Sequence, residues 1–91
     1  MLSQIPNNID KKDVDKEILR AGIIAELDAI NLYEQMSSMT TDKNIRKILL
    51  DIAKEEKTHV GEFQTLLLRF DKQQEKELIE GKKEVEEELG K

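Results

Sequence analysis

The chain of 91 residues contains no cysteine. This absence excludes a disulfide framework, a thiolate metal site and a rubredoxin-type iron centre. Its single proline, Pro6, stands near the N-terminus, so the rest of the sequence contains no residue that breaks a helix by lacking an N–H. Only 3% of the residues are aromatic whereas 38% are charged, which is typical of a helical protein with large solvated faces.

An excess of positive charge and a long apolar run are also absent. The formal net charge is -5, which argues against nucleic acid as a partner because phosphates require a basic surface. No apolar run approaches the roughly 18 residues that span a bilayer, so we expect no membrane segment. The first residues lack the basic region and apolar block of a signal peptide, which predicts a cytoplasmic protein. A chain of this length buries only about 60–65% of its unfolded surface, so a monomer would be marginally stable.

The first half of the chain predicts a polar tail followed by one long helix. Residues 1–11 are the tail, and either Asp10 or Asp13 could cap the helix that follows. The helical pattern continues to about Ser38 and ends in the polar segment 39–42, which we interpret as a turn.

The second half predicts another long helix and a charged C-terminal segment. Thr41 or Asp42 could cap a helix that covers residues 43–70, so that residues 12–70 form an antiparallel hairpin. Residues 71–91 carry eight acids against five lysines and few apolar side chains. We expect a short helix there, interrupted by Gly81 and either loosely held or completed by a partner. The predicted fold is all-α.

One face of the second predicted helix is apolar except at two adjacent positions. Its residues recur in alternating steps of four and three, which is the spacing of a helix face that packs against another helix. They are Ile45, Leu49, Ile52, Glu56, His59, Phe63, Leu66 and Phe70. The stripe is widened on one side by Ala53, Val60 and Leu67.

The first predicted helix shows the same pattern with one carboxylate in the apolar row. The row consists of Leu19, Ile23, Glu26, Ile30 and Tyr33. Three further apolar residues lie off this row, and their exposure in a hairpin would indicate a second packing surface: Ile24, Leu27 and Leu32.

The three polar exceptions should lie at the same level of the hairpin. Pairing Glu26 with the middle of the Glu56–His59 pair puts the midpoint at about residue 42, inside the turn that was placed independently. This level is roughly 20–25 Å from the turn. Residues three apart on a helix project together, so Glu56 and His59 point at one locus, and Glu26 can reach it from the other helix.

These residue types in apolar rows favour a metal site. A buried carboxylate costs several kcal/mol unless a positive charge compensates it. Four-helix bundles that hold two metal ions use one Glu from each of two helices and Glu-x-x-His from each of the other two. This chain carries one of each, so a two-fold homodimer would complete both. Carboxylate-rich ligation with one imidazole per metal favours iron or manganese over a structural zinc site.

Two segments carry a resemblance to a known family. The run Glu26-Leu27-Asp28-Ala29-Ile30-Asn31-Leu32-Tyr33, together with Glu55-Glu56-Lys57-Thr58-His59, resembles the encapsulated ferritins over about residues 16–70. The resemblance implies a ferritin-like four-helix bundle made by two chains, with a di-iron site. It implies a higher ring of dimers, a decamer, and ferroxidase activity inside an encapsulin nanocompartment, because an open ring cannot store mineral itself.

The resemblance also implies roles for single residues. Glu26, Glu56 and His59 would be the iron ligands, with Glu56 bridging, and Tyr33 would lie near the site. No encapsulin-targeting peptide is apparent after Gly81, and some members of the family are fused to the shell protein instead.

Other positions depart from the family pattern or have weaker roles. Ala25 stands where members often carry an acid, Asp28 keeps the other acidic position of their proposed metal-entry site, and Leu32 stands where a larger aromatic can occur. Glu55 and Glu62 flank the ligand pair. For Glu55 and Glu62 a role in metal binding, and for Asp28 a role in the path of metal entry, competes with that of an ordinary solvated side chain. For Tyr33 a supporting or redox role beside the site competes with simple packing and a hydrogen bond.

Two alternative functions are compatible with the sequence. One is a rubrerythrin-like di-metal enzyme that reduces peroxide, although its usual electron-transfer domain needs cysteines that this chain lacks. The other is a metal-free structural hairpin that oligomerises through its apolar rows.

Overall fold

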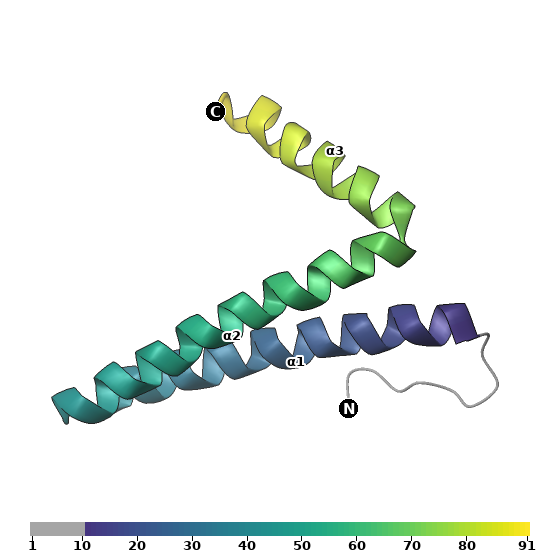
Figure 1. Ribbon diagram of the computed structural model, residues 1–91. Coiled ribbons are helices and arrows are strands. Elements are labelled where there is room, and N and C mark those ends of the chain that lie inside the picture. The colour runs from purple at the N-terminus through teal and green to yellow at the C-terminus, as the bar shows by residue number, and fades with distance from the viewer. Residues whose placement is uncertain (1–10) are drawn as a thin grey trace.

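The computed structural model describes residues 11–91 and consists of three helices (Figure 1). They are α1 (Lys11–Met39), α2 (Lys43–Phe70) and α3 (Lys72–Leu89). Helices α1 and α2 lie side by side as an antiparallel hairpin, and α3 turns back from the end of α2 at a sharp angle (Figure 1). The all-α fold predicted from the sequence is therefore confirmed.

The turn of the hairpin is closed by a cap at the start of α2. The Asp42 carboxylate accepts hydrogen bonds from the backbone N–H groups of Asn44 (2.8 Å) and Ile45 (3.0 Å), which have no partner inside the helix. Asp42 is thus the cap of α2. At the other end, α1 begins at Lys11, so Asp13 lies in its first turn, and Asp10 lies outside the described residues.

Polar contacts between α1 and α2 fix how the two helices are aligned. Arg46 donates to the carbonyl oxygens of Ser37 (3.0 Å) and Thr40 (2.7 Å) beside the turn. Further along, Lys57 Nζ lies 3.0 Å from Glu34 Oε2. Exposed ion pairs contribute well under about 1 kcal/mol each, so their effect is mainly on the alignment of the hairpin.

The buried apolar core of the hairpin is small. Its most buried apolar residues are Leu19, Ile30, Ala53 and Leu67. Leu19 and Ile30 belong to the row predicted for the first helix, which therefore faces α2 as expected. Such a core leaves little stability after the conformational entropy of the chain is subtracted.

The prediction for the second helix was wrong in one respect. Two of the residues expected to widen the stripe, Ala53 and Leu67, are the most buried on α2, whereas Ile45, Leu66 and Phe70 of the row itself remain 51%, 45% and 40% exposed. Helix periodicity defines faces relative to one another, but not which face meets the neighbouring helix. The predicted row of α2 therefore lies along one edge of the hairpin, where it is open to a partner.

Apolar residues are also exposed away from this edge. Leu27 and Leu32 on α1 are about half exposed, which agrees with the second packing surface expected there. Ile24 lines an apolar groove between the hairpin and α3, and Leu78 supplies the α3 side of that groove.

Asp71 forms the corner between α2 and α3. Its backbone N–H donates to Leu67 O (2.9 Å) and ends α2, while its carboxylate accepts from Gln74 N (2.9 Å) and caps α3. The same carboxylate accepts a 2.7 Å hydrogen bond from the Arg20 guanidinium on α1. One buried side chain thus ties all three helices together.

The third helix is longer and more regular than predicted. It runs through Gly81 without a break and ends at Gly90, whose φ of 73° is the left-handed conformation that glycine adopts at little cost. Gly81 destabilises α3 by about 1 kcal/mol relative to alanine, and the helix forms because its other residues favour the helical conformation. None of the helices in residues 11–91 is both long and apolar enough to cross a membrane.

Replacing Asp71 with asparagine is expected to destabilise the corner in a pH-dependent way. The Gln74 N–H, together with the Arg20 guanidinium and the charge of Lys16, holds the pKa of the Asp71 carboxyl below its ordinary value of 3.8. Asparagine keeps the helix cap but loses the ion pair. The parent should therefore be the more stable protein at neutral pH.

Thermal unfolding at pH 7 and at pH 3, followed by circular dichroism, measures this effect. A carboxyl with a lowered pKa stabilises the fold above its unfolded value, and this contribution is lost as the pH falls through the folded value. The gap between parent and Asp71→Asn should thus shrink below pH 3.8. Asp51→Asn, the same change at an exposed position, is the control; an equal effect there would contradict the role of the corner.

Candidate metal centre

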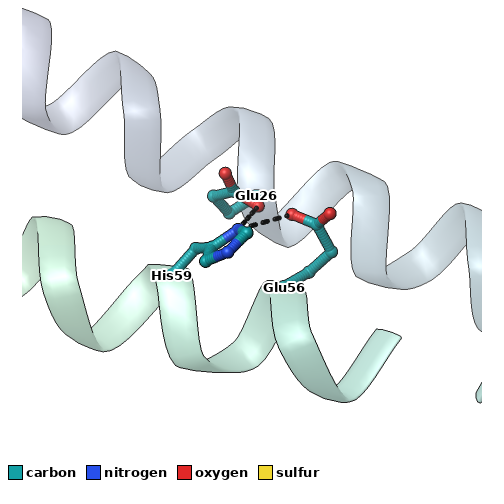
Figure 2. Close-up of side chains that lie close together, drawn as sticks. All are labelled: Glu26, Glu56 and His59. Atoms are coloured by element: carbon teal, nitrogen blue, oxygen red, sulfur yellow. Dashed lines mark hydrogen bonds and ion pairs between the residues drawn. The ribbon is translucent and has the colours of Figure 1, made fainter. Parts of the chain in front are cut away.

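Three ligand-type side chains meet between α1 and α2 (Figure 2). Glu26 projects from α1, and Glu56 and His59 project from consecutive turns of α2 (Figure 2). His59 Nδ1 lies 3.3 Å from Glu56 Oε2 and 3.5 Å from Glu26 Oε2. One ligand atom from each residue lies within 4.8 Å of the others. The structure therefore brings together the three residues that the sequence placed at one level of the hairpin.

Local sequence explains how each side chain reaches this locus. Glu56 and His59 are separated by three residues, so they lie on neighbouring turns of one helix face. Glu26 lies in the α1 row that faces α2, between the buried residues Leu19 and Ile30. The turn between α1 and α2 sets the register of the hairpin, so Glu26 lies opposite the Glu56–His59 pair.

The two carboxylates of the cluster are more buried than the imidazole. The side chains of Glu26 and Glu56 are only 18% and 19% exposed, whereas that of His59 is 44% exposed. Glu26 Oε2 is buried and accepts no hydrogen bond in the described part of the chain, although His59 is close. An unpartnered carboxylate oxygen beside a second carboxylate is costly without a cation. The donors present, two carboxylates and one imidazole, fit a divalent metal ion such as Fe(II) or Mn(II).

An open cavity of about 370 Å³ lies next to these ligands. It is lined by Glu26, His59, Glu62, Phe63 and Leu66. The cavity lies on the edge of the hairpin that carries the exposed apolar row of α2, so a partner seated on this edge would close it.

The weaker candidates from the sequence lie around this centre. Glu62 is exposed but lines the cavity, one turn beyond His59. Glu55 and Asp28 are exposed and, like the half-buried Tyr33, belong neither to the ligand cluster nor to the cavity wall.

Gly22 is a feature of the centre that the sequence pattern did not predict. It lies on α1 one turn before Glu26 and in close contact with the ring of Phe63. The available signal was a glycine inside a long helix, where it costs about 1 kcal/mol relative to alanine.

Comparison with known proteins identifies relatives over nearly the whole chain. Residues 1–87 match the model of the EncFtn-like family. The chain is 56% identical to a ferritin-like-encapsulin shell fusion protein of Pyrococcus furiosus, over 99% of this chain and 28% of that protein. It is 36% identical to the encapsulin nanocompartment cargo protein EncC of Myxococcus xanthus, over 72% of this chain and 53% of that protein. The chain thus spans less than a third of the first relative and about half of the second.

A solved structure is similar in fold as well as in sequence. It is the crystal structure of the encapsulated ferritin domain from Pyrococcus furiosus, with a TM-score of 0.87 and 56% identity. The match covers 100% of this chain and 98% of that domain.

Proposed function

Because this chain belongs to the EncFtn-like family, we propose that it is a ferroxidase that oxidises Fe(II) to Fe(III) with oxygen. The observation that carries the proposal is the convergence of Glu26, Glu56 and His59 at one level of a two-helix hairpin. Each Fe(II) gives up one electron, and oxygen takes up electrons and protons to form peroxide or water. Iron is the substrate, and the protein supplies the ligands that hold it.

The site is completed by a second copy of the chain. Di-metal bundles of this kind need one Glu from each of two helices and Glu-x-x-His from each of the other two, and one hairpin supplies half of that set. Two copies bring four carboxylates and two imidazoles, whose charge of -4 two Fe(II) ions neutralise. In this arrangement Glu26 and His59 would each serve as a terminal ligand, and Glu56 would be shared between the two metal ions.

The exposed apolar edge supports this two-fold arrangement. Ile45, Leu66 and Phe70 are 51%, 45% and 40% exposed on the side of α2 that also carries Glu56 and His59. A hairpin with a small core of its own gains most from burying such an edge against a copy of itself. Rings built from these dimers remain part of the proposal.

We place this activity inside an encapsulin compartment. One relative is named as a fusion of a ferritin-like protein with an encapsulin shell, and another as an encapsulin cargo protein. The shell would enclose the Fe(III) product, and the partner of this chain would be the shell protein, either fused or separate.

Fe(II) oxidation in air, followed by near-ultraviolet absorbance, tests the function. The protein should oxidise Fe(II) much faster than buffer. The same protein loaded beforehand with Zn(II), which fits the ligands but does not change oxidation state, should fall to the buffer rate.

Two results would contradict the proposal. A rate equal to buffer, with the protein folded and its association state indifferent to chelator and metal, would favour a structural hairpin. Faster turnover with peroxide than with oxygen would favour a rubrerythrin-like enzyme.

A further inference from the structure

The ring of Phe63 occupies the space that a side chain at position 22 would fill. A methyl group built on the Cα of Gly22 would lie 2.9 Å from Phe63 Cε1 and 3.0 Å from both Cδ1 and Cζ. These separations are well inside carbon–carbon van der Waals contact at about 3.5–4.0 Å. Only glycine at this position lets the ring lie directly against the backbone of α1.

This contact lies one helical turn from the metal ligands on both helices. Gly22 precedes Glu26 by four residues on α1, and Phe63 follows His59 by four residues on α2. Phe63 also lines the cavity that Glu26 and His59 share. Long side chains on a helix lean toward its N-terminus, so Phe63 leans over the turn that carries His59.

The other two helical glycines with described surroundings differ from Gly22. A Cβ at Gly61 or at Gly81 would meet no atom of the described residues within 4 Å. A glycine inside a helix costs about 1 kcal/mol relative to alanine at all three positions, but only at Gly22 does the structure use the missing side chain.

We propose that Gly22 and Phe63 are positioning residues of the metal centre. The Phe63 ring, seated in the slot at Gly22, forms part of the wall of the cavity that Glu26 and His59 also line. From there it holds the His59 imidazole where Nδ1 faces both Glu26 and Glu56. This inference rests on the proposed function, because it concerns how the same ligands are held.

Replacing Gly22 with alanine would displace the ring. Cores are packed too closely to absorb an added methyl group without movement. The ring can move into the cavity shared with His59 or outward to the exposed edge of the hairpin, and either movement changes the support of the imidazole. Removing the hydrogen-bonded partners that orient metal ligands typically weakens metal binding 10–100-fold, and we expect the loss of a packing support to fall at the low end of that range.

Titration with Co(II) tests the inference without depending on catalysis. Cobalt is used as the probe because its visible absorption reports both occupancy and coordination geometry. We expect Gly22→Ala to raise the apparent Kd for Co(II) about tenfold and to alter the absorption bands. Gly61→Ala, the same change at an open position of α2, should bind and absorb like the parent.

A second substitution separates displacement of the ring from general destabilisation. In the double variant Gly22→Ala, Phe63→Leu, the smaller side chain leaves room for the new methyl group, so Co(II) affinity should equal that of Phe63→Leu alone rather than fall by the sum of the two single losses. Thermal unfolding of each metal-free variant shows whether a change in Co(II) affinity arises at the metal site or from a loss of stability of the whole fold. If Gly22→Ala fails to fold, Phe63→Leu alone still applies, and it should weaken binding relative to the parent.

The outcomes distinguish this inference from the proposed function. Parent-like affinity and spectrum in Gly22→Ala or in Phe63→Leu would overturn the positioning role while leaving the metal site intact. Additive losses in the double variant would also overturn it, since Gly22→Ala would then weaken binding by a route that does not involve the ring. A parent that binds no Co(II) would overturn the metal site itself and this inference with it.

Discussion

Glu56→Ala is expected to reduce Fe(II) oxidation to the rate of buffer, a loss of more than about 100-fold. Removing a residue that merely supports a ligand typically costs 10–100-fold, and Glu56 is proposed to bind both metals of the shared site. A two-fold dimer loses both bridging carboxylates at once, so no intact half remains. The buried neighbour Glu26 would lose the cation that compensates its charge.

The neighbouring residue provides a matched control. Glu55→Ala removes the same charge from the same helix, but Glu55 is exposed and lies outside the ligand cluster. The initial rate of absorbance increase after Fe(II) addition in air should be parent-like for Glu55→Ala. Equal rates for the two variants would show that net acidity, rather than the geometry of the cluster, promotes oxidation.

Ile45→Asp is expected to prevent association and to abolish Fe(II) oxidation with it. Ile45 is 51% exposed in the single chain, so a carboxylate there is solvated and the hairpin still folds. In the proposed dimer the same carboxylate would be buried in an apolar seam without a partner, which costs several kcal/mol. Association should weaken by at least about 100-fold, since each 1.4 kcal/mol is a factor of ten.

Sedimentation velocity and the oxidation assay together measure this effect. Leu50→Asp is the control, because Leu50 is exposed on the same helix but faces about 140° away from Ile45 around the axis. It should leave the metal-sharing dimer and its activity in place. A dimeric, active Ile45→Asp variant would show that the partner does not lie on this edge.

Much of the hairpin could be predicted because its signals are local. Asp42 caps α2 through its own neighbours, and apolar residues at steps of three and four define helical faces. The level of Glu26 opposite Glu56 and His59 followed from the place of the turn alone. A carboxylate or imidazole in an apolar row is informative because its burial is costly unless a hydrogen-bond partner or a cation compensates it.

Other features depend on three-dimensional packing that a linear pattern does not contain. The chain has more apolar surface than one hairpin can bury, so periodicity could not decide whether Ala53 or Ile45 faces α1. The contact between Gly22 and Phe63 joins residues far apart in the sequence. The only sign of it in the sequence is a glycine inside a predicted helix. Gly81 is also a glycine inside a helix, but a methyl group there would contact no side chain among the described residues, and α3 continues through it.

Because α3 extends from the corner at Asp71 as one straight helix, a small change of angle at the corner produces a large displacement at its far end. Its 18 residues extend about 27 Å from that corner, so a change of ten degrees there would move the far end by about 5 Å. The Arg20–Asp71 ion pair lies at this corner, so a small change in its geometry is amplified at the far end of α3. The direction of α3, and the position of anything bound at its far end, therefore depends on the contacts of the Asp71 carboxylate.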